Sequence, residues 1–173
     1  MSIPSEDDCK YVAGIFEGEG SVGAYFEGYG KKYTLRRPQI ELRIEMYDKD
    51  IIEWIAKTFA GNLTPRKRAA QVSFSEHALI PFLKAILPYL HGKRRREQAA
   101  LVFKLYEVKK QHISRKDVHR RQEMADLAGR INSYNYGGGK RTRRDYTHLS
   151  KPLLAEDIVQ TTLIEVAEAE ASA

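Results

Sequence analysis

The residues best suited to chemistry lie in one short run near the amino terminus, from Tyr11 to Val22. Gly14 and Gly18 stand four residues apart, so on a helix they share a face and leave a stripe without side chains, which a second helix can approach closely. Glu19 follows at the predicted helix end, where unpaired carbonyl oxygens carry partial negative charge. Carboxylate and carbonyl oxygens are the natural ligands of hard divalent cations. The run predicts a cation site beside a helix contact, although a helix that frays into a glycine turn explains the same glycines.

The residues before this run form a helix start. Ser5 and Asp8 have the spacing of a capping box, and the acidic residues at 6–8 lie at the positive end of the helix dipole. We therefore expect a helix from about Glu6 to about Gly18.

Length and charge favour one domain with a polyanionic partner. A chain of 173 residues can bury a core of its own, and its 29 Lys and Arg against 23 Asp and Glu give a formal charge of +6. Acidic residues cluster at both ends, which leaves the middle of the chain more basic than the whole. A nucleic acid is the natural partner for such a charge distribution.

Other classes of protein are disfavoured by what the chain does not contain. The single cysteine, Cys9, excludes an intrachain disulfide and a cysteine-based zinc cluster, and the histidines never fall at i,i+4. No secretory signal pattern opens the sequence, and no apolar run approaches the roughly 18 residues of a membrane span. We expect an intracellular protein that is not secreted, in the cytoplasm, the nucleoid or an organelle, without a membrane partner.

Alternating polarity predicts two antiparallel hairpins. One runs from Ser21 to Met46 through a glycine-rich basic turn at 28–32, with a second strand from Tyr33 onward and clean alternation from Gln39 to Met46. A shorter one runs from Leu63 to Phe74, and its Pro65 implies an edge strand or a bulge. These hairpins would each bury one face of their strands.

Helical periodicity fills the rest of the chain. Asp48 or Asp50 can cap a helix that ends at Gly61, a suitable C-cap residue. Further helices are predicted over about 75–90, which Pro81 and Pro88 must start, kink or divide, and over about 93–111 and 114–134. A basic loop at 136–151 and an acidic amphipathic helix at about 155–169 follow. The order predicts an α+β fold in a single domain over 1–173, with its core at about 6–134.

The run from Val12 to Gly20 resembles the LAGLIDADG motif, with Val for the first Leu, Gly for the second Ala, and Glu in place of both Asp residues. The order of elements also resembles that family over roughly Asp7 to Tyr134. The resemblance implies an αββαββα core with a curved antiparallel sheet and additional C-terminal helices.

One motif in a chain of this length is similar to the homodimeric homing endonucleases, in which two motif helices pack at a twofold axis. The resemblance implies a dimer interface through Tyr11, Gly14, Ile15 and Gly18. It makes Glu19 and the carbonyl of Gly18 ligands of Mg²⁺, for which Mn²⁺ or Ca²⁺ can substitute in binding. The implied activity is intron-encoded, site-specific cleavage of both DNA strands on a long, roughly palindromic site, with metal-assisted phosphodiester hydrolysis.

The resemblance also points to a polar residue before the second helix and a basic residue before a later Gln-Ala pair, where Asp48 and Arg95 stand. Relatives commonly have Gln and Lys at these two places. Lys93 or Arg96 could take the role of Arg95 in charge stabilisation. Helix capping explains Asp48 equally well, and a solvated basic run explains 93–96.

The outward positions of both hairpins suit the DNA major groove, which admits a two-stranded β-ribbon. Arginine suits guanine, glutamine suits adenine and glutamate suits cytosine, although any one-sided sheet keeps a polar outer face. The residues expected to face the bases are Tyr25, Glu27, Gln39, Glu41, Arg43, Glu45, Thr64, Arg66, Gln71 and Ser73. The residues expected to meet phosphates are Lys31, Lys32, Arg36, Arg37, Lys67, Arg68, Lys140, Arg141, Arg143 and Arg144.

Three other functions remain open on the sequence alone. An RNA maturase that helps its host intron fold would use the same basic surface on RNA. A regulator of this fold that binds DNA without cutting it is a second alternative, which the retained Glu17 and Glu19 disfavour. A basic α+β protein with an accidental likeness to the motif is the third.

Overall fold

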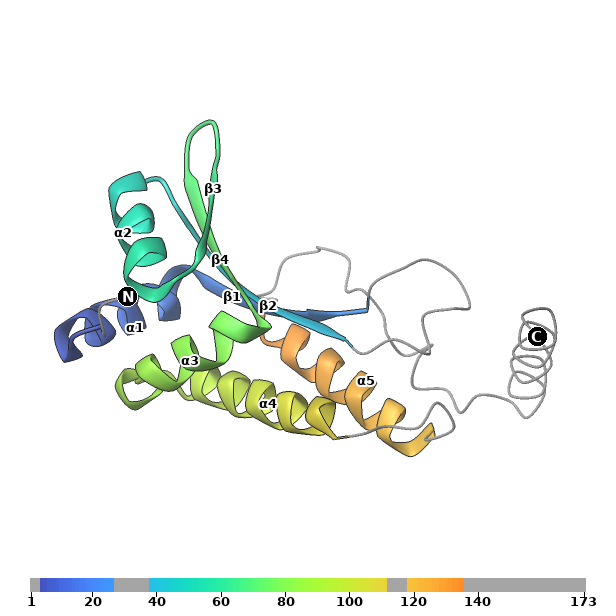
Figure 1. Cartoon of the computed structure of the whole chain (residues 1–173). Helices are drawn as coiled ribbons and strands as arrows, with labels where there is room; N and C mark the ends of the chain where they lie inside the picture. The colour runs from blue at the N-terminus through green and yellow to red at the C-terminus, as the bar shows by residue number, and fades with distance from the viewer. Residues whose placement is uncertain (1–3, 27–37, 112–117, 136–173) are drawn as a thin grey trace, which may run out of the picture.

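The computed structural model describes residues 4–26, 38–111 and 118–135 (Figure 1). Its elements in chain order are α1 (Glu6–Glu19), β1 (Gly20–Tyr25), β2 (Gln39–Met46), α2 (Lys49–Phe59), β3 (Asn62–Pro65), β4 (Ala70–Ser75), α3 (Glu76–Ile86), the 3-10 turn η2 (Leu87–Tyr89), α4 (Lys93–Lys110) and α5 (Val118–Ser133). This order confirms the α+β class and the αββαββα core, with further helices after it. The predicted basic turn at 28–32, the basic loop at 136–151 and the helix at 155–169 lie outside the described residues.

The four strands form one antiparallel sheet in the order β1-β2-β4-β3. Val22 pairs with Leu42, Arg43 with Ser73, and Thr64 with Gln71, so both predicted hairpins are present as neighbouring strands. Pro65 lies in β3 at the edge of the sheet, where its missing N–H leaves no ladder hydrogen bond unmade. The prediction of an edge position for this proline is confirmed.

One face of the sheet is apolar and the helices cover it (Figure 1). Val22, Leu42, Ile44, Val72 and Phe74 are fully buried there, in the period of two that a strand requires. Phe74 stacks on Phe82 of α3 at a centroid distance of 4.2 Å. Burial of this face fixes the register, because a slip of one residue would turn the polar set inward.

The amino-terminal helix begins as its sequence predicts. The Asp8 N–H donates to Ser5 Oγ at 3.2 Å, and the Ser5 N–H donates to Asp8 Oδ2 at 2.9 Å, which completes a capping box. The helix ends at Glu19, one residue beyond the predicted end. Strand β1 follows at once, so Glu19 lies at the junction of helix and sheet.

The end of α2 differs from its prediction. Ala60, not Gly61, takes the left-handed conformation, with φ of 57°, while the Gly61 N–H donates to Ala56 O at 2.9 Å. Gly61 is needed for space instead, since a Cβ there would lie 2.3 Å from Cγ2 of Val72. Packing of the helix end onto β4 requires a residue without a side chain at this position.

The carboxyl-terminal helices lie beneath the sheet (Figure 1). Pro81 lies inside α3 and does not divide it, whereas Pro88 lies in η2, where the helix ends. Within the described ranges, no helix has both the length and the apolar character needed to span a membrane.

Two asparagines at the end of α5 cover the free edge of β1. Asn132 accepts from the Ala24 N–H at 2.9 Å and donates to the Ala24 carbonyl at 2.6 Å. Asn135 makes the same pair of contacts with the backbone of Val22. The two amides replace a neighbouring strand, so the backbone groups of this edge are paired and the strand is held in place.

We expect Gly61→Ala to lower the free energy of unfolding by about 1–3 kcal/mol, because the new methyl group must displace Val72 or the Phe74 ring. Urea titration followed by circular dichroism measures this. The matched control is Gly129→Ala in α5, where a Cβ meets nothing within 4 Å and the better helix propensity of alanine should add up to about 1 kcal/mol. Equal effects of the two substitutions would contradict the packing role of Gly61.

Candidate metal and nucleic-acid site

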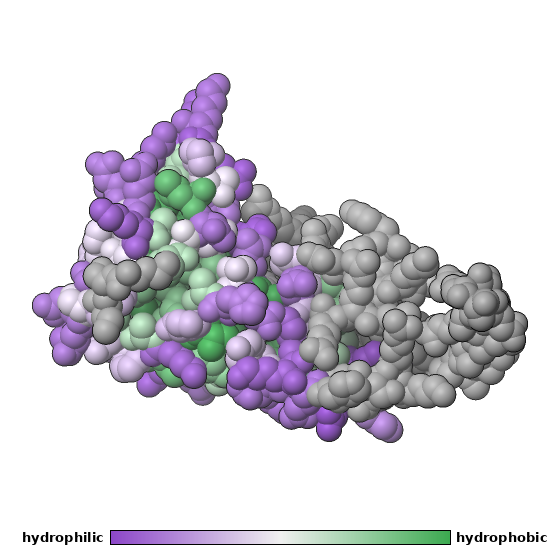
Figure 2. Space-filling view, viewed as in Figure 1, coloured by the Kyte–Doolittle hydropathy of each residue, from purple (hydrophilic) through white to green (hydrophobic). Residues whose placement is uncertain are grey.

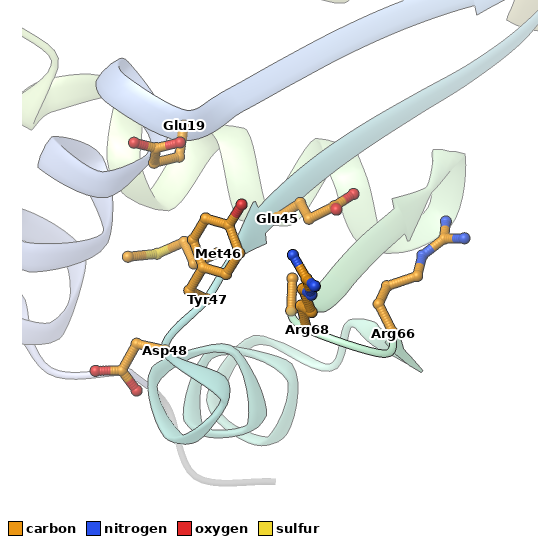
Figure 3. A pocket seen from close by; sticks show the side chains of 8 residues that line it. Glu19, Glu45, Met46, Tyr47, Asp48, Arg66 and Arg68 are labelled. Carbon is orange, nitrogen blue, oxygen red and sulfur yellow. The ribbon is translucent and has the colours of Figure 1, made fainter.

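A pocket of about 560 Å³ lies where α1, β2, α2 and the β3–β4 turn meet. Its lining consists of Glu19, Glu45, Met46, Tyr47, Asp48, Arg66, Arg68 and Ala69. Figure 3 shows Glu19 and Asp48 on one side of the pocket and the two arginines on the other. The structure therefore brings together two of the residues expected in catalysis, Glu19 and Asp48, with two expected to bind DNA.

Glu19 is the exposed end of α1. Its carboxylate has no hydrogen-bond or ion-pair partner in the described part of the chain, and the last turn of the helix contains no basic residue. The Gly20 N–H donates to Phe16 O, which closes the helix end. A full negative charge thus lies next to the negative end of a helix dipole, an arrangement that a bound cation would stabilise.

Asp48 caps α2 and lies at the pocket. Its Oδ1 accepts from the Ile51 N–H at 3.3 Å and caps α2, and the residue also lines the pocket. The cap orients the carboxylate at the helix start.

Arg95 packs against the junction of α1 and β1. Its guanidinium donates to the Gly20 carbonyl and, at 2.8 Å, to Gln98 Oε1, and it lies 5.1 Å from the centroid of the Phe16 ring. Burial lowers the pKa of Arg95, and the neighbouring Arg94 lowers it further, while Glu17 acts in the opposite direction. Arg95 is thus held by the carbonyl of Gly20, the residue after Glu19. It is not among the residues that line the pocket.

The basic run at the start of α4 is tied to α1 by Glu17. Glu17 Oε1 accepts from the Gly92 N–H at 2.5 Å, at the N-cap position of a helix that has no side-chain cap of its own. This contact offsets the positive charge gathered at a positive helix end. Lys93 and Arg96 are exposed, and Lys93 lies 3.8 Å from Glu97.

The face expected to form the dimer interface is open. In the described part of the chain, a Cβ on Gly14 or on Gly18 would meet nothing within 4 Å, Ile15 is half-buried, and Tyr11 is 52% exposed. The Tyr11 ring lies 5.8 Å from Trp54 of α2. The glycine stripe therefore lies on the surface, where another helix can reach it.

The outer face of β2 carries a linked set of polar side chains. Arg43 Nη2 donates to Glu41 Oε2 at 2.5 Å, and the Tyr25 hydroxyl lies 3.4 Å from the same oxygen. The hydrogen bond that Arg43 donates to Glu41 raises the pKa of Arg43 against the lowering effect of its partial burial. Glu41, expected to face the bases, accepts a hydrogen bond from its neighbour on the same strand, and its expected contact with DNA stays a prediction.

Gln71 is buried. Its position on the outer face is as expected, but its side chain is only 7% exposed, since Arg66 Nη2 donates to Gln71 Oε1 at 2.9 Å. The alternation of β4 correctly predicted the face and could not show that a residue from the hairpin turn covers it. The expected contact of Gln71 with DNA stays a prediction.

The remaining expected DNA contacts divide into two groups. Gln39, Glu45, Thr64, Lys67 and Arg68 are exposed and Ser73 is half-buried, on the outer face or in the β3–β4 turn. That hairpin projects from the molecule and its tip is hydrophilic (Figure 1, Figure 2). The residues that lie outside the described ranges are Glu27, Lys31, Lys32, Arg36, Arg37, Lys140, Arg141, Arg143 and Arg144.

Tyr47 is a pocket residue that sequence reasoning missed. It is 81% exposed, in the short link between β2 and the Asp48 cap. The signal available in the sequence was the end of strand alternation at Met46 followed by a helix cap, which leaves Tyr47 without a face to bury.

Solved structures similar to this chain include three homing endonucleases. I-CvuI, bound to its target in the presence of Ca, is 22% identical over 86% of this chain and 93% of its own, with a TM-score of 0.68. The archaeal intron-encoded I-Vdi141I, complexed with DNA, is 16% identical over 89% and 99%, with a TM-score of 0.68. The group I intron-encoded I-CeuI, also complexed with DNA, is 14% identical over 88% and 78%, with a TM-score of 0.61.

The chain has the fold of the LAGLIDADG homing endonucleases. No protein-family model matches it, and neither does any curated protein sequence. In this LAGLIDADG fold, α1 is the element that contains the motif-like run.

We expect Arg95→Ala to cost about 1–3 kcal/mol of unfolding free energy, because it removes hydrogen bonds and ring contact at the α1–β1 junction. Lys93→Ala is the matched control, since the Lys93 side chain is 87% exposed and its loss should change stability by less than about 0.5 kcal/mol. Thermal unfolding of both variants measures the difference. If Arg95→Ala is as stable as Lys93→Ala, Arg95 does not hold the junction.

Proposed function

We propose that this chain is a homodimeric, divalent-metal-dependent endonuclease that cleaves a specific DNA site. The observation that carries the proposal is the position of Glu19, an unpaired carboxylate at the end of a helix whose neighbouring face is bare glycine. Glu19 shares a pocket with Asp48 and with Arg66 and Arg68. Acidic groups for a cation and basic groups for a phosphate therefore lie in one place.

The donor chemistry fits Mg²⁺ when two chains contribute. Glu19 and the carbonyl of Gly18 are hard oxygen donors at the negative end of a helix, which suits this ion. Among the described residues of one chain, no group of three or more His, Cys, Asp or Glu side chains is placed to hold a metal. A second Glu19 and oxygens of the bound phosphate would complete the ligand set. The metal, when bound, would supply charge stabilisation and an activated water for phosphodiester hydrolysis.

The glycine stripe supports dimerisation through α1. Two glycines cost a helix interior about 1 kcal/mol each relative to alanine, and among the described residues no atom lies within 4 Å of a Cβ placed on Gly14 or Gly18. A second copy of α1 against the same face would use the open backbone and bring both Glu19 residues near a twofold axis. That symmetry favours a roughly palindromic DNA site.

The sheet supports DNA as the polymer. Its outer face carries polar residues, and its projecting hairpin ends in the exposed residues Arg66, Lys67 and Arg68. A ribbon of this kind fits the major groove, while the basic turn binds phosphates in any sequence. The similar structures that were solved with DNA support this partner.

We expect Glu19→Gln to reduce the cleavage rate at least about 100-fold, since it removes a metal-binding charge worth several kcal/mol in the transition state. Binding in Ca²⁺ should change little, because the sheet supplies most of the DNA contacts. Single-turnover cleavage and gel-shift titration on a site selected from randomised DNA measure the two properties.

Wild-type cleavage by Glu19→Gln would exclude Glu19 as the metal ligand. Specific binding without cleavage by the wild-type protein in Mg²⁺ or Mn²⁺ would favour a non-cutting regulator. Preferential binding and folding of intron RNA would favour a maturase.

We expect Gly14→Leu to prevent dimerisation, because a side chain on the stripe would separate the two copies of α1. The chain should still fold, since the space beside Gly14 is open in a single copy. Gly129→Leu in α5 is the matched control, with equally open space and no place in the proposed interface. Analytical ultracentrifugation with and without DNA measures the outcome, and an undiminished dimer of Gly14→Leu would contradict the proposed interface.

A further inference from the structure

Arg43 is held in one orientation on the outer face of the sheet. Glu41, two residues earlier on the same strand, accepts from Arg43 Nη2 at 2.5 Å, and the side chains of Glu41 and Arg43 are 20% and 52% exposed. The Tyr25 hydroxyl contacts the same Glu41 oxygen from the paired strand β1. The acceptor is thus held from two strands, while much of the guanidinium remains open to solvent.

Arg66 is held in a similar way at the other side of the sheet. Its Nη2 donates to Oε1 of Gln71, whose side chain is 7% exposed and therefore has little freedom to move away. Arg66 itself is exposed. In both pairs a covered acceptor takes one N–H of an exposed arginine.

A guanidinium held by one N–H keeps further donors for a ligand. Arginine carries five N–H groups in a planar fork, so a second pair remains for O6 and N7 of guanine, the commonest specific contact in the major groove. Holding the side chain before binding removes much of the entropy cost of ordering it on DNA. The guanidinium has donors only, so it disfavours a base edge that offers a donor in place of O6 and N7.

We propose that each half-site of the DNA target contains guanine at two positions, read by Arg43 and Arg66, and that Glu41 and Gln71 are positioning residues and not base readers. This inference rests on the proposed function. It changes the assignment that residue type alone suggests for Glu41 and Gln71, which was cytosine and adenine. Oε2 of Glu41 accepts a hydrogen bond from Arg43, and Oε1 of Gln71 accepts one from Arg66.

The fold also predicts which of the two guanines lies nearer the point of cleavage. Arg66 lines the pocket that contains Glu19, whereas Arg43 lies further along β2, on the side away from Asp48. Gln71, the partner of Arg66, pairs across the sheet with Glu45, and Arg43 pairs with Ser73 of β4 and with Ser21 of β1. The guanine read by Arg66 should therefore lie nearer the point of cleavage.

The experiment is selection of bound DNA from a randomised duplex library in Ca²⁺, followed by sequencing, for the full chain and its variants. We expect the wild-type protein to select two guanine positions in each half-site. Arg43→Lys and Arg66→Lys keep the charge but lose the planar fork, so each should reduce preference at one position by roughly 5- to 150-fold, with Arg66→Lys acting on the inner one.

Variants of the positioning residues separate orientation from direct reading. Glu41→Gln should weaken the preference for guanine at the Arg43 position without creating or removing a preference elsewhere, and Tyr25→Phe should do so more weakly. Lys67→Ala should reduce affinity for all sequences alike, because it is expected to contact phosphate. Glu123→Gln is the control. Glu123 lies in α5 and pairs with Lys104 of α4, so this substitution should leave selection unchanged.

The outcomes distinguish this inference from the proposed function. If no DNA sequence is selected, the proposed function itself fails. If a site is selected without guanine at two positions, or if Arg43→Lys and Arg66→Lys leave the base preferences intact, the endonuclease proposal stands and the arginine assignment is overturned. A cytosine preference that disappears in Glu41→Gln would show that Glu41 reads a base directly.

Discussion

The rest of the structure depends on two contacts, here called the clamp, that join α4 to the junction of α1 with β1. Glu17 binds the backbone at the start of α4, and Arg95 binds the carbonyl of Gly20 from within that helix. These contacts lie on both sides of Glu19 in the chain. Because each uses a charged group on a backbone partner, both are stronger than ordinary neutral hydrogen bonds. Between them lies Glu19, the acidic residue of the proposed metal site, whose carboxylate has no hydrogen-bond or ion-pair partner among the described residues.

The sheet is fixed relative to this clamp through a polar network on β1. Gln98 of α4 donates to the carbonyl of Ile131 at 3.1 Å and to Asn135 Oδ1 at 3.0 Å, and Asn135 in turn holds the backbone of Val22. Gln98 is fully buried, so its hydrogen bonds are costly to break. A strand edge, two helices and the helix end that presents Glu19 therefore form one connected unit. The outer face of the sheet keeps a constant relation to the pocket as a result.

The pocket beside Glu19 contains charges of both signs. The pocket contains the carboxylates of Glu19, Glu45 and Asp48, which would repel a DNA phosphate in the absence of a cation. Arg66 and Arg68 enter the same pocket from the hairpin turn. Charges of both signs in one pocket would suit the joint binding of a cation and a phosphate, which the proposed metal-assisted hydrolysis requires.

The sequence alone determined the order of elements, the start of α1, the strand faces and the edge position of Pro65. These features depend on local periodicity, capping and backbone chemistry, which are set by residues close together in the sequence. It also placed Glu19 at a helix end with glycines on one face. Tertiary structure decided which contacts other side chains make. Arg95 donates to Gly20, Gln71 is covered by Arg66, and Gly61 is needed for packing and not for a left-handed turn. Such contacts join residues from different elements. A polar side chain has several possible partners in the sequence, and only the fold determines which of them lies within hydrogen-bond distance.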